Sequence, residues 1–162
     1  MKEYIYNRKG TIDYAKEWAM KRNPKYFNFD KFGGDCTNFA SQCIYAGCNT
    51  MNYKPILGWY YNNSDDRTAS WTGVEYLYNF LINNTSIGPF AKEVTKEEIE
   101  IGDIIQLGNS NHHFYHSPVV IKKEGNNIFI AAHSDDTYMK NILDYNFDII
   151  RYIHIIGFRK NN

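Results

Sequence analysis

Apolar residues recur at helical spacing near the start of the chain. In segment 11–24, Ile12, Ala15 and Trp18 fall on one face of a 3.6-residue repeat. Thr11 is a suitable N-cap, and Pro24 stops the pattern. The segment therefore predicts an amphipathic helix.

Two further helices are predicted before residue 85. Segment 36–46 is mostly apolar and is followed by Gly47, a residue typical of helix C-caps. Segment 72–84 has an apolar stripe, and the spacing of Thr72 and Glu75 is that of a capping box. Between these segments, residues 49–70 have no clean period, and a loop of that length is usually functional or poorly ordered.

After Gly102 the pattern changes to short β-branched and aromatic runs separated by Gly and Asn, which read "DIIQL", "SPVVIKK", "NIFIAAH" and "YIHIIGF". The "EGNN" between the second and third runs predicts a hairpin turn. Helices followed by strands indicate an α+β fold with a mainly antiparallel sheet. We expect residues 1–162 to form one domain.

Composition narrows the functional classes. The 18 basic and 18 acidic residues cancel, so binding to a nucleic-acid backbone is disfavoured. Three cysteines without a C-x-x-C pattern disfavour both a disulfide framework and a structural zinc site. No segment is apolar enough for a membrane span, and "MKEYIYNRKG" lacks the apolar region of a signal peptide. We expect no cofactor. We also expect the protein to be made in the cytoplasm and to leave the cell by a route that needs no signal peptide, or to be part of a longer chain.

The stretch "GGDCTNFASQCIYAG" places Cys36 where a helix begins. A helix N-terminus stabilises a thiolate, which is the nucleophilic form of cysteine. Gly33 and Gly34 remove side chains from the approach to the sulfur. Cys43 and Cys48 lack this position, so we interpret them as buried packing residues.

A cysteine nucleophile needs a base from elsewhere in the chain. His116 precedes one predicted strand and His133 ends the next, and the two are nearly equidistant from the "EGNN" turn. If those strands pair, His116 could be the base and His133 the group that orients it. We expect His112 and His113 to lie in a polar loop and His154 to be structural. A zinc site is the chemical alternative, although the spacings match no ordinary zinc pattern; its ligands would be His112, His116, His133 and Cys36.

The run "DCTNFASQCIYAG" resembles the signature of the bacterial family described as the putative amidase domain, within the papain-like cysteine hydrolases. The blocks "SWTGVEYLYNFL", "EIGDIIQL", "HSPVVI" and "AAHSDD" follow the family's order over nearly the whole chain. The resemblance implies a papain-like fold and hydrolysis of amide bonds in bacterial peptidoglycan. It implies Cys36 as nucleophile, His116 as base and His133 as third catalytic group, with Asp135 as the fallback. An Asp commonly precedes this His in the family, whereas Tyr115 stands here.

Aromatic residues supply the expected substrate surface, with Trp59, Tyr60 and Trp71 as the wall of a groove for glycan or peptide. Asn38 matches the signature and is a further candidate for substrate contact. The expected partner is peptidoglycan or its stem peptides, at the bacterial cell wall, as in an endolysin. Two alternatives stay open: an inactive cell-wall-binding module, and a papain-like acyltransferase or toxin with the same triad.

Overall fold

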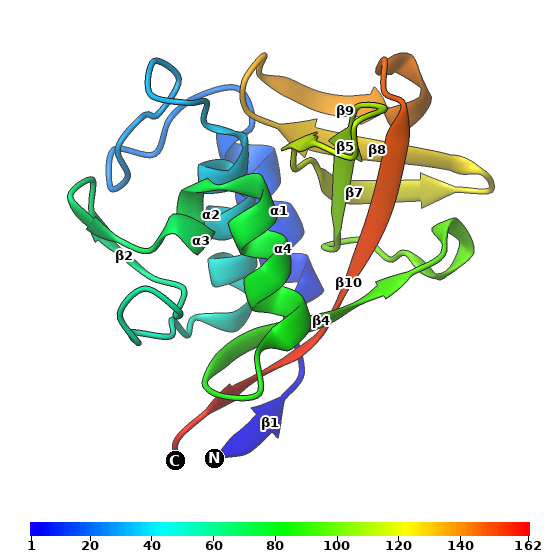
Figure 1. Cartoon of the computed structure of the whole chain (residues 1–162). Coiled ribbons are helices and arrows are strands. Elements are labelled where there is room, and N and C mark those ends of the chain that lie inside the picture. Colours follow the sequence, from blue (N-terminus) through cyan, green and yellow to red (C-terminus); the bar gives the residue numbers. More distant parts are fainter.

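The computed structural model describes residues 1–162 and places the helices on one side of a curled antiparallel sheet (Figure 1). The α+β class expected from the sequence is confirmed. The helices are α1 (Arg8–Trp18), α2 (Cys36–Cys48), α3 (Ala69–Thr72) and α4 (Val74–Asn83), with two short 3-10 turns, η1 (Lys96–Glu98) and η2 (Ile142–Asp144).

Eight of the ten strands form the main sheet, in the order β1-β10-β5-β7-β8-β9, with β4 also paired to β10 and β6 to β5. A separate hairpin joins β2 to β3. The strands are β1 (Lys2–Tyr4), β2 (Tyr61–Asn63), β3 (Asp66–Arg67), β4 (Gly88–Val94), β5 (Ile104–Gly108), β6 (Phe114–His116), β7 (Val119–Glu124), β8 (Asn127–Ala132), β9 (Thr137–Asn141) and β10 (Ile149–Lys160).

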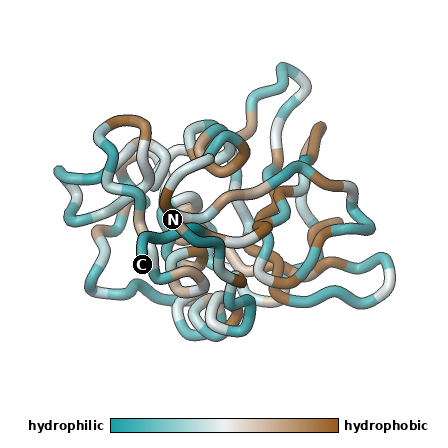
Figure 2. The backbone as a smooth tube through the Cα atoms, turned by 90° about the horizontal axis from the view of Figure 1, so that it is seen from below, coloured by the Kyte–Doolittle hydropathy of each residue, from teal (hydrophilic) through white to brown (hydrophobic).

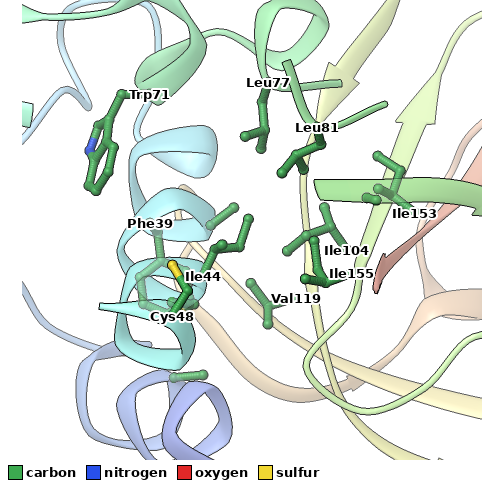
Figure 3. Close-up of a cluster of buried hydrophobic side chains, with 14 of the residues drawn as sticks. Phe39, Ile44, Cys48, Trp71, Leu77, Leu81, Ile104, Val119, Ile153 and Ile155 are labelled. Carbon is green, nitrogen blue, oxygen red and sulfur yellow. The ribbon is translucent and has the colours of Figure 1, made fainter. Parts of the chain in front are cut away.

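Side-chain alternation along the strands divides the core into two clusters. Ile104 and Val119 face the helices and belong to the larger cluster, which also contains the apolar side of α2, including Phe39 and Ile44 (Figure 3). Their neighbours Ile105 and Val120 belong to a smaller cluster on the other face, which the curl of the sheet encloses. Burial on both faces explains why these strands read as continuous apolar runs.

The observed helix ends differ from the predicted ones by a few residues. Asn7, rather than Thr11, is the N-cap of α1, and its side chain accepts a hydrogen bond from the Gly10 N–H. Helix α2 continues past Gly47 to Cys48, and Asn49 takes the left-handed C-cap conformation with φ 47°. A Cβ at Gly47 would overlap buried side chains of the α1 region, so this glycine permits close packing of α1 and α2.

The capping box predicted at Thr72 and Glu75 is wrong, because Thr72 ends α3 and Gly73 is the N-cap of α4. The Glu75 carboxylate instead lies 3.0 Å from the Arg151 guanidinium. Residues 49–70 are ordered around the β2–β3 hairpin and a bridge between Asn52 and Trp59.

The two ends of the chain lie side by side, because β1 pairs with the end of β10, as the view from below shows (Figure 2). The outermost loops in that view are largely hydrophilic. No helix combines the length and the apolar character needed to cross a lipid bilayer.

Candidate active site

Cys36 begins α2 and is the only one of the three cysteines that is not buried. Its sulfur lies 3.9 Å from the carbonyl oxygen of Tyr115, and the hydroxyl of Thr37 lies 3.2 Å from that of Ser117. These contacts join the first turn of α2 to the residues on either side of His116. The structure therefore places Cys36 beside the segment that carries His116, but no hydrogen bond joins the Cys36 sulfur to the His116 ring.

The pKa of the Cys36 thiol is raised, contrary to the expectation from the helix N-terminus. Burial is the main cause, and the neighbouring carboxylate of Asp35 acts in the same direction. Hydrogen bonds from the Thr37 hydroxyl and from the backbone N–H groups of Thr37 and Ser117 lower the pKa without offsetting the burial. The thiol is therefore protonated at neutral pH in this conformation.

The approach to the sulfur is open and offers a hydrogen-bond donor. The backbone N–H of Cys36 donates to no group of the protein, as is usual in the first turn of a helix. Gly33 and Gly34 have φ values of 93° and 99°, which L side chains rarely adopt, and no atom lies within 4 Å of where a Cβ would be at either position. The free N–H and the thiol therefore belong to the same residue, and neither Gly33 nor Gly34 adds a side chain beside them.

The His116 ring is buried but makes no hydrogen bond to the protein, and it packs on the ring of Tyr145 with centroids 5.4 Å apart. Burial lowers its pKa to about 4, and the charge of Lys140 contributes to the lowering. The carboxylate of Asp135 acts in the opposite direction. The imidazole is thus neutral at pH 7 and has a free lone pair, as a general base requires.

His133 does not orient His116. Its Nδ1 lies 2.6 Å from Oδ2 of Asp35, and its Nε2 lies 2.8 Å from the carbonyl oxygen of Trp18. Because the Trp18 carbonyl can only accept, Nε2 donates to it, and Nδ1 is hydrogen-bonded to the Asp35 carboxylate. Both nitrogens are occupied, so the expected hydrogen bond between His133 and His116 is absent.

The register of the β7–β8 hairpin explains this outcome. The hairpin forms as predicted, with Val119 opposite Ala131. Extending that register by two residues places Ser117, rather than His116, opposite His133. Since adjacent residues of a strand point to opposite faces, His116 and His133 are directed to different sides of the ribbon.

Asp35 is the residue that sequence reasoning missed. Its carboxylate is fully buried, accepts hydrogen bonds from the Phe29 N–H at 2.8 Å and the Asn38 side chain at 2.9 Å, and lies 3.4 Å from Nε of Arg22. Together with His133, these groups tie the loop before Cys36 to the end of β8. The only signal in the sequence was an acidic residue placed between a glycine pair and a cysteine.

Three of the four expected substrate contacts lie in the interior. Trp59 and Trp71 have no exposed surface, and their indole N–H groups donate to Ser41 and Asn38. The Asn38 side chain is also buried and has partners for its oxygen and both of its N–H groups. These residues therefore brace α2 against α3. Burial rules out the groove-wall role expected for the two tryptophans and the substrate contact expected for Asn38. Tyr60 is partly exposed, and its hydroxyl donates to Asp66.

A different aromatic surface adjoins the base. An open pocket of about 540 Å³ lies beside Tyr145, whose ring contacts His116, and Tyr115, whose carbonyl faces the thiol. Its lining consists of Tyr115, Leu143, Tyr145, Asn146, Phe147 and Asp148. No apolar period in the sequence marked this segment.

Cys36, His112, His116 and His133, the ligands considered for zinc, do not form a group of converging ligand atoms, and both ring nitrogens of His133 are occupied. The cluster whose atoms could surround a cation is instead Glu100, Asp103 and His154. There, both oxygens of Asp103 already accept hydrogen bonds, one of them from Arg8, and the Arg8 guanidinium supplies the positive charge. This cluster is a structural ion-pair network.

The fold and the site define an α+β protein in which one partly exposed thiol at a helix start lies beside the strand that ends in a neutral imidazole. The chain belongs to the family described as "Putative amidase domain", whose model matches residues 5–156. That description indicates hydrolase activity on amides. The chain is also 34% identical over 142 residues to the uncharacterized protein YhbB of Bacillus subtilis (strain 168), covering 85% of this chain and 44% of that protein. It thus spans less than half of that relative's length, and no solved structure matches it.

Proposed function

We propose that the chain is a cysteine-dependent amide hydrolase in which Cys36 is the nucleophile and His116 the general base. The observation behind this proposal is the pair of contacts that bracket His116 against the first turn of α2. Cys43 and Cys48 are unsuited to the role, because both are buried and burial raises the pKa of each thiol, that of Cys48 to about 12.

The protonation states favour general-base catalysis over a preformed ion pair. Neutral His116 removes the thiol proton as the sulfur of Cys36 attacks the amide carbon, forming a C–S bond and a tetrahedral oxyanion. The free N–H of Cys36 donates to that oxyanion, an interaction worth about 3 kcal/mol in comparable sites. The imidazolium then protonates the leaving amine as the C–N bond breaks. Water, deprotonated by the same ring, hydrolyses the thioester and restores the thiol.

Asp135 is the better candidate for the third polar group, because its carboxylate favours the protonated form of His116. In this proposal, His133 does not contact the base but acts through Asp35. Its hydrogen bond to Asp35 fixes the loop that delivers Cys36, so it is a positioning residue rather than a partner of the base.

The proposed substrate is the peptide portion of bacterial peptidoglycan. The proposed fold is papain-like, with the helix that carries Cys36 packed against an antiparallel sheet. The resemblance of the motif "DCTNFASQ" suggests this substrate, and the aromatic pocket beside Tyr145 offers a surface for it. The site of action would be the bacterial cell wall, with the chain as one part of a longer cell-wall protein.

Digestion of purified cell wall, followed by mass spectrometry of the fragments, tests the proposal. The wild-type chain should release new amine and carboxylate ends, and Cys36→Ala should reduce the rate at least about a thousandfold. Cys43→Ala, which removes a buried thiol of the same helix, is the matched control and should retain activity. Full activity of Cys36→Ala would refute the proposal.

Two other outcomes identify the alternatives. Equal binding of cell wall by wild type and Cys36→Ala without any cleavage would indicate a binding module. A product that contains a new amide bond would indicate an acyltransferase.

A further inference from the structure

Arg67 has no acidic partner, unlike every other arginine of the chain. Four of the five arginines form ion pairs with carboxylates, and these are Arg8, Arg22, Arg151 and Arg159. Arg67 makes neither an ion pair nor a side-chain hydrogen bond. Its Nε, like that of Arg22, is buried without a hydrogen-bond acceptor, but the other nitrogens of Arg22 have carboxylate partners. Buried unsatisfied donors are rare in folded proteins, so this one calls for an explanation.

Nearby acids do not supply the missing partner. Asp66 is adjacent in β3, but its two oxygens accept hydrogen bonds from the Tyr60 hydroxyl and the Asn62 side chain. Alternation along the strand directs Asp66 and Arg67 to opposite faces. No carboxylate therefore pairs with the guanidinium at the surface on which it packs.

That surface is aromatic. The guanidinium carbon of Arg67 lies 4.7 Å from the centroid of the Phe29 ring, and Phe27 packs on both Phe29 and Phe32. Phe29 is buried, whereas Phe27 and Phe32 expose 40% and 68% of their surface. An arginine held over an aromatic ring keeps its planar fork oriented at a low entropic cost.

The same loop leads to the proposed nucleophile. The Phe29 carbonyl accepts a hydrogen bond from the Gly34 N–H, and the Phe29 N–H donates to Asp35. Gly33 and Gly34 follow, with no atom within 4 Å of where a Cβ would lie at either position, and Cys36 is two residues further on. Arg67 is therefore one side chain away from the segment that delivers the thiol.

We infer that Arg67 recognises a free carboxylate of the substrate peptide, a few residues from the scissile amide. This inference rests on the proposed function. A carboxylate can accept two parallel hydrogen bonds from a guanidinium, whereas the cancelling charges of the chain, 18 basic and 18 acidic residues, disfavour a nucleic-acid backbone. Phe27 and Phe32 would contact the apolar parts of the same peptide.

The test compares kcat/KM for paired substrates. The stem tetrapeptide linked to its sugar is prepared with free carboxylates and, separately, with each carboxylate converted to a primary amide. The wild-type chain should prefer one free carboxylate by about tenfold or more. Arg67→Gln should remove this preference, and Arg67→Lys should restore part of it, because an ammonium keeps the charge without the fork. Arg159→Gln, which removes an arginine paired with Glu3 near the chain ends, is the control and should keep the preference.

The ratio of the kcat/KM values of one protein for two substrates does not change when only part of that protein is folded. An unchanged preference in Arg67→Gln, or no preference in the wild type, would overturn the inference. If the chain cleaves none of these peptides, the proposed function fails, and calorimetric binding of the tetrapeptide decides the inference separately. Binding that weakens about tenfold on amidation in the wild type, but not in Arg67→Gln, supports the role of Arg67, and equal binding refutes it.

Discussion

Substitution of Asp35 tests whether a buried carboxylate holds the loop that delivers Cys36. In Asp35→Ala, the Phe29 N–H loses its acceptor, the Asn38 amide loses one of its two acceptors, and His133 loses its partner at Nδ1. Each buried donor left unsatisfied costs about 1–3 kcal/mol, and breaking a buried charge pair typically costs about 3–5 kcal/mol. We therefore expect a loss of about 4 kcal/mol in the free energy of unfolding.

Asp35→Asn is the matched comparison, because it removes the charge and keeps the shape. The amide oxygen can remain opposite the Phe29 and Asn38 donors, which directs the NH₂ group toward Nδ1 of His133. A neutral His133 with its proton on Nε2 can accept from that NH₂ group and still donate to Trp18. The remaining cost is the lost attraction to Arg22, so we expect about 1–2 kcal/mol.

Urea unfolding followed by fluorescence measures both differences. For a chain of this size, 1 kcal/mol corresponds to about 2–4 °C in Tm, so Asp35→Ala should melt at least about 8 °C below the wild type. A loss below about 1 kcal/mol in Asp35→Ala would refute the structural role of the network. Equal losses in the two variants would refute the assignment of its hydrogen bonds.

The remaining predictions concern packing and pH. Gly47→Ala should destabilise the chain by about 2 kcal/mol in urea unfolding, because the added methyl overlaps the Thr11 side chain, and a wild-type free energy would contradict the close packing of α1 and α2. The acid limb of kcat/KM should report His116 near pH 4, and Lys140→Gln should move it to higher pH, because loss of a positive neighbour raises the pKa of the ring. Asp135→Asn should move the limb to lower pH, and shifts in the opposite directions would refute the charges assigned to this site.

Local patterns in the sequence predict the elements of this fold but not how the elements meet. The apolar spacing around Trp18 and the "EGNN" turn identify a helix and a hairpin because both signals depend on near neighbours. Strand β6 and the edge strand β9 escaped notice, since short strands with mixed polarity have no distinctive period. Gly47 reads as a C-cap in sequence, yet its close contact with α1 is a tertiary feature.

The candidate site shows the same difference between local signals, which the sequence carries, and tertiary contacts, which it does not. Cys36 was predictable, because its position at a helix start is encoded by the adjacent glycines and the apolar run that follows. The role of His133 was not, because a one-residue difference in hairpin register reverses the face on which a side chain lies. Composition suggested that Trp59 and Trp71 line a groove, but a short chain with large aromatic residues also needs them to fill its core.

The protonation of Cys36 follows from a competition between two effects of known direction. The helix N-terminus and its N–H groups favour the thiolate, whereas burial against β6 and the Asp35 carboxylate favour the thiol. Burial outweighs the first effect, and the same burial keeps His116 neutral. A neutral pair carries no charge that needs solvation in a partly closed site, so it costs little before substrate arrives. In the proposed mechanism the charges arise during attack, where the Cys36 N–H and the Asp135 carboxylate can stabilise them, and this is the stage at which stabilisation accelerates a reaction.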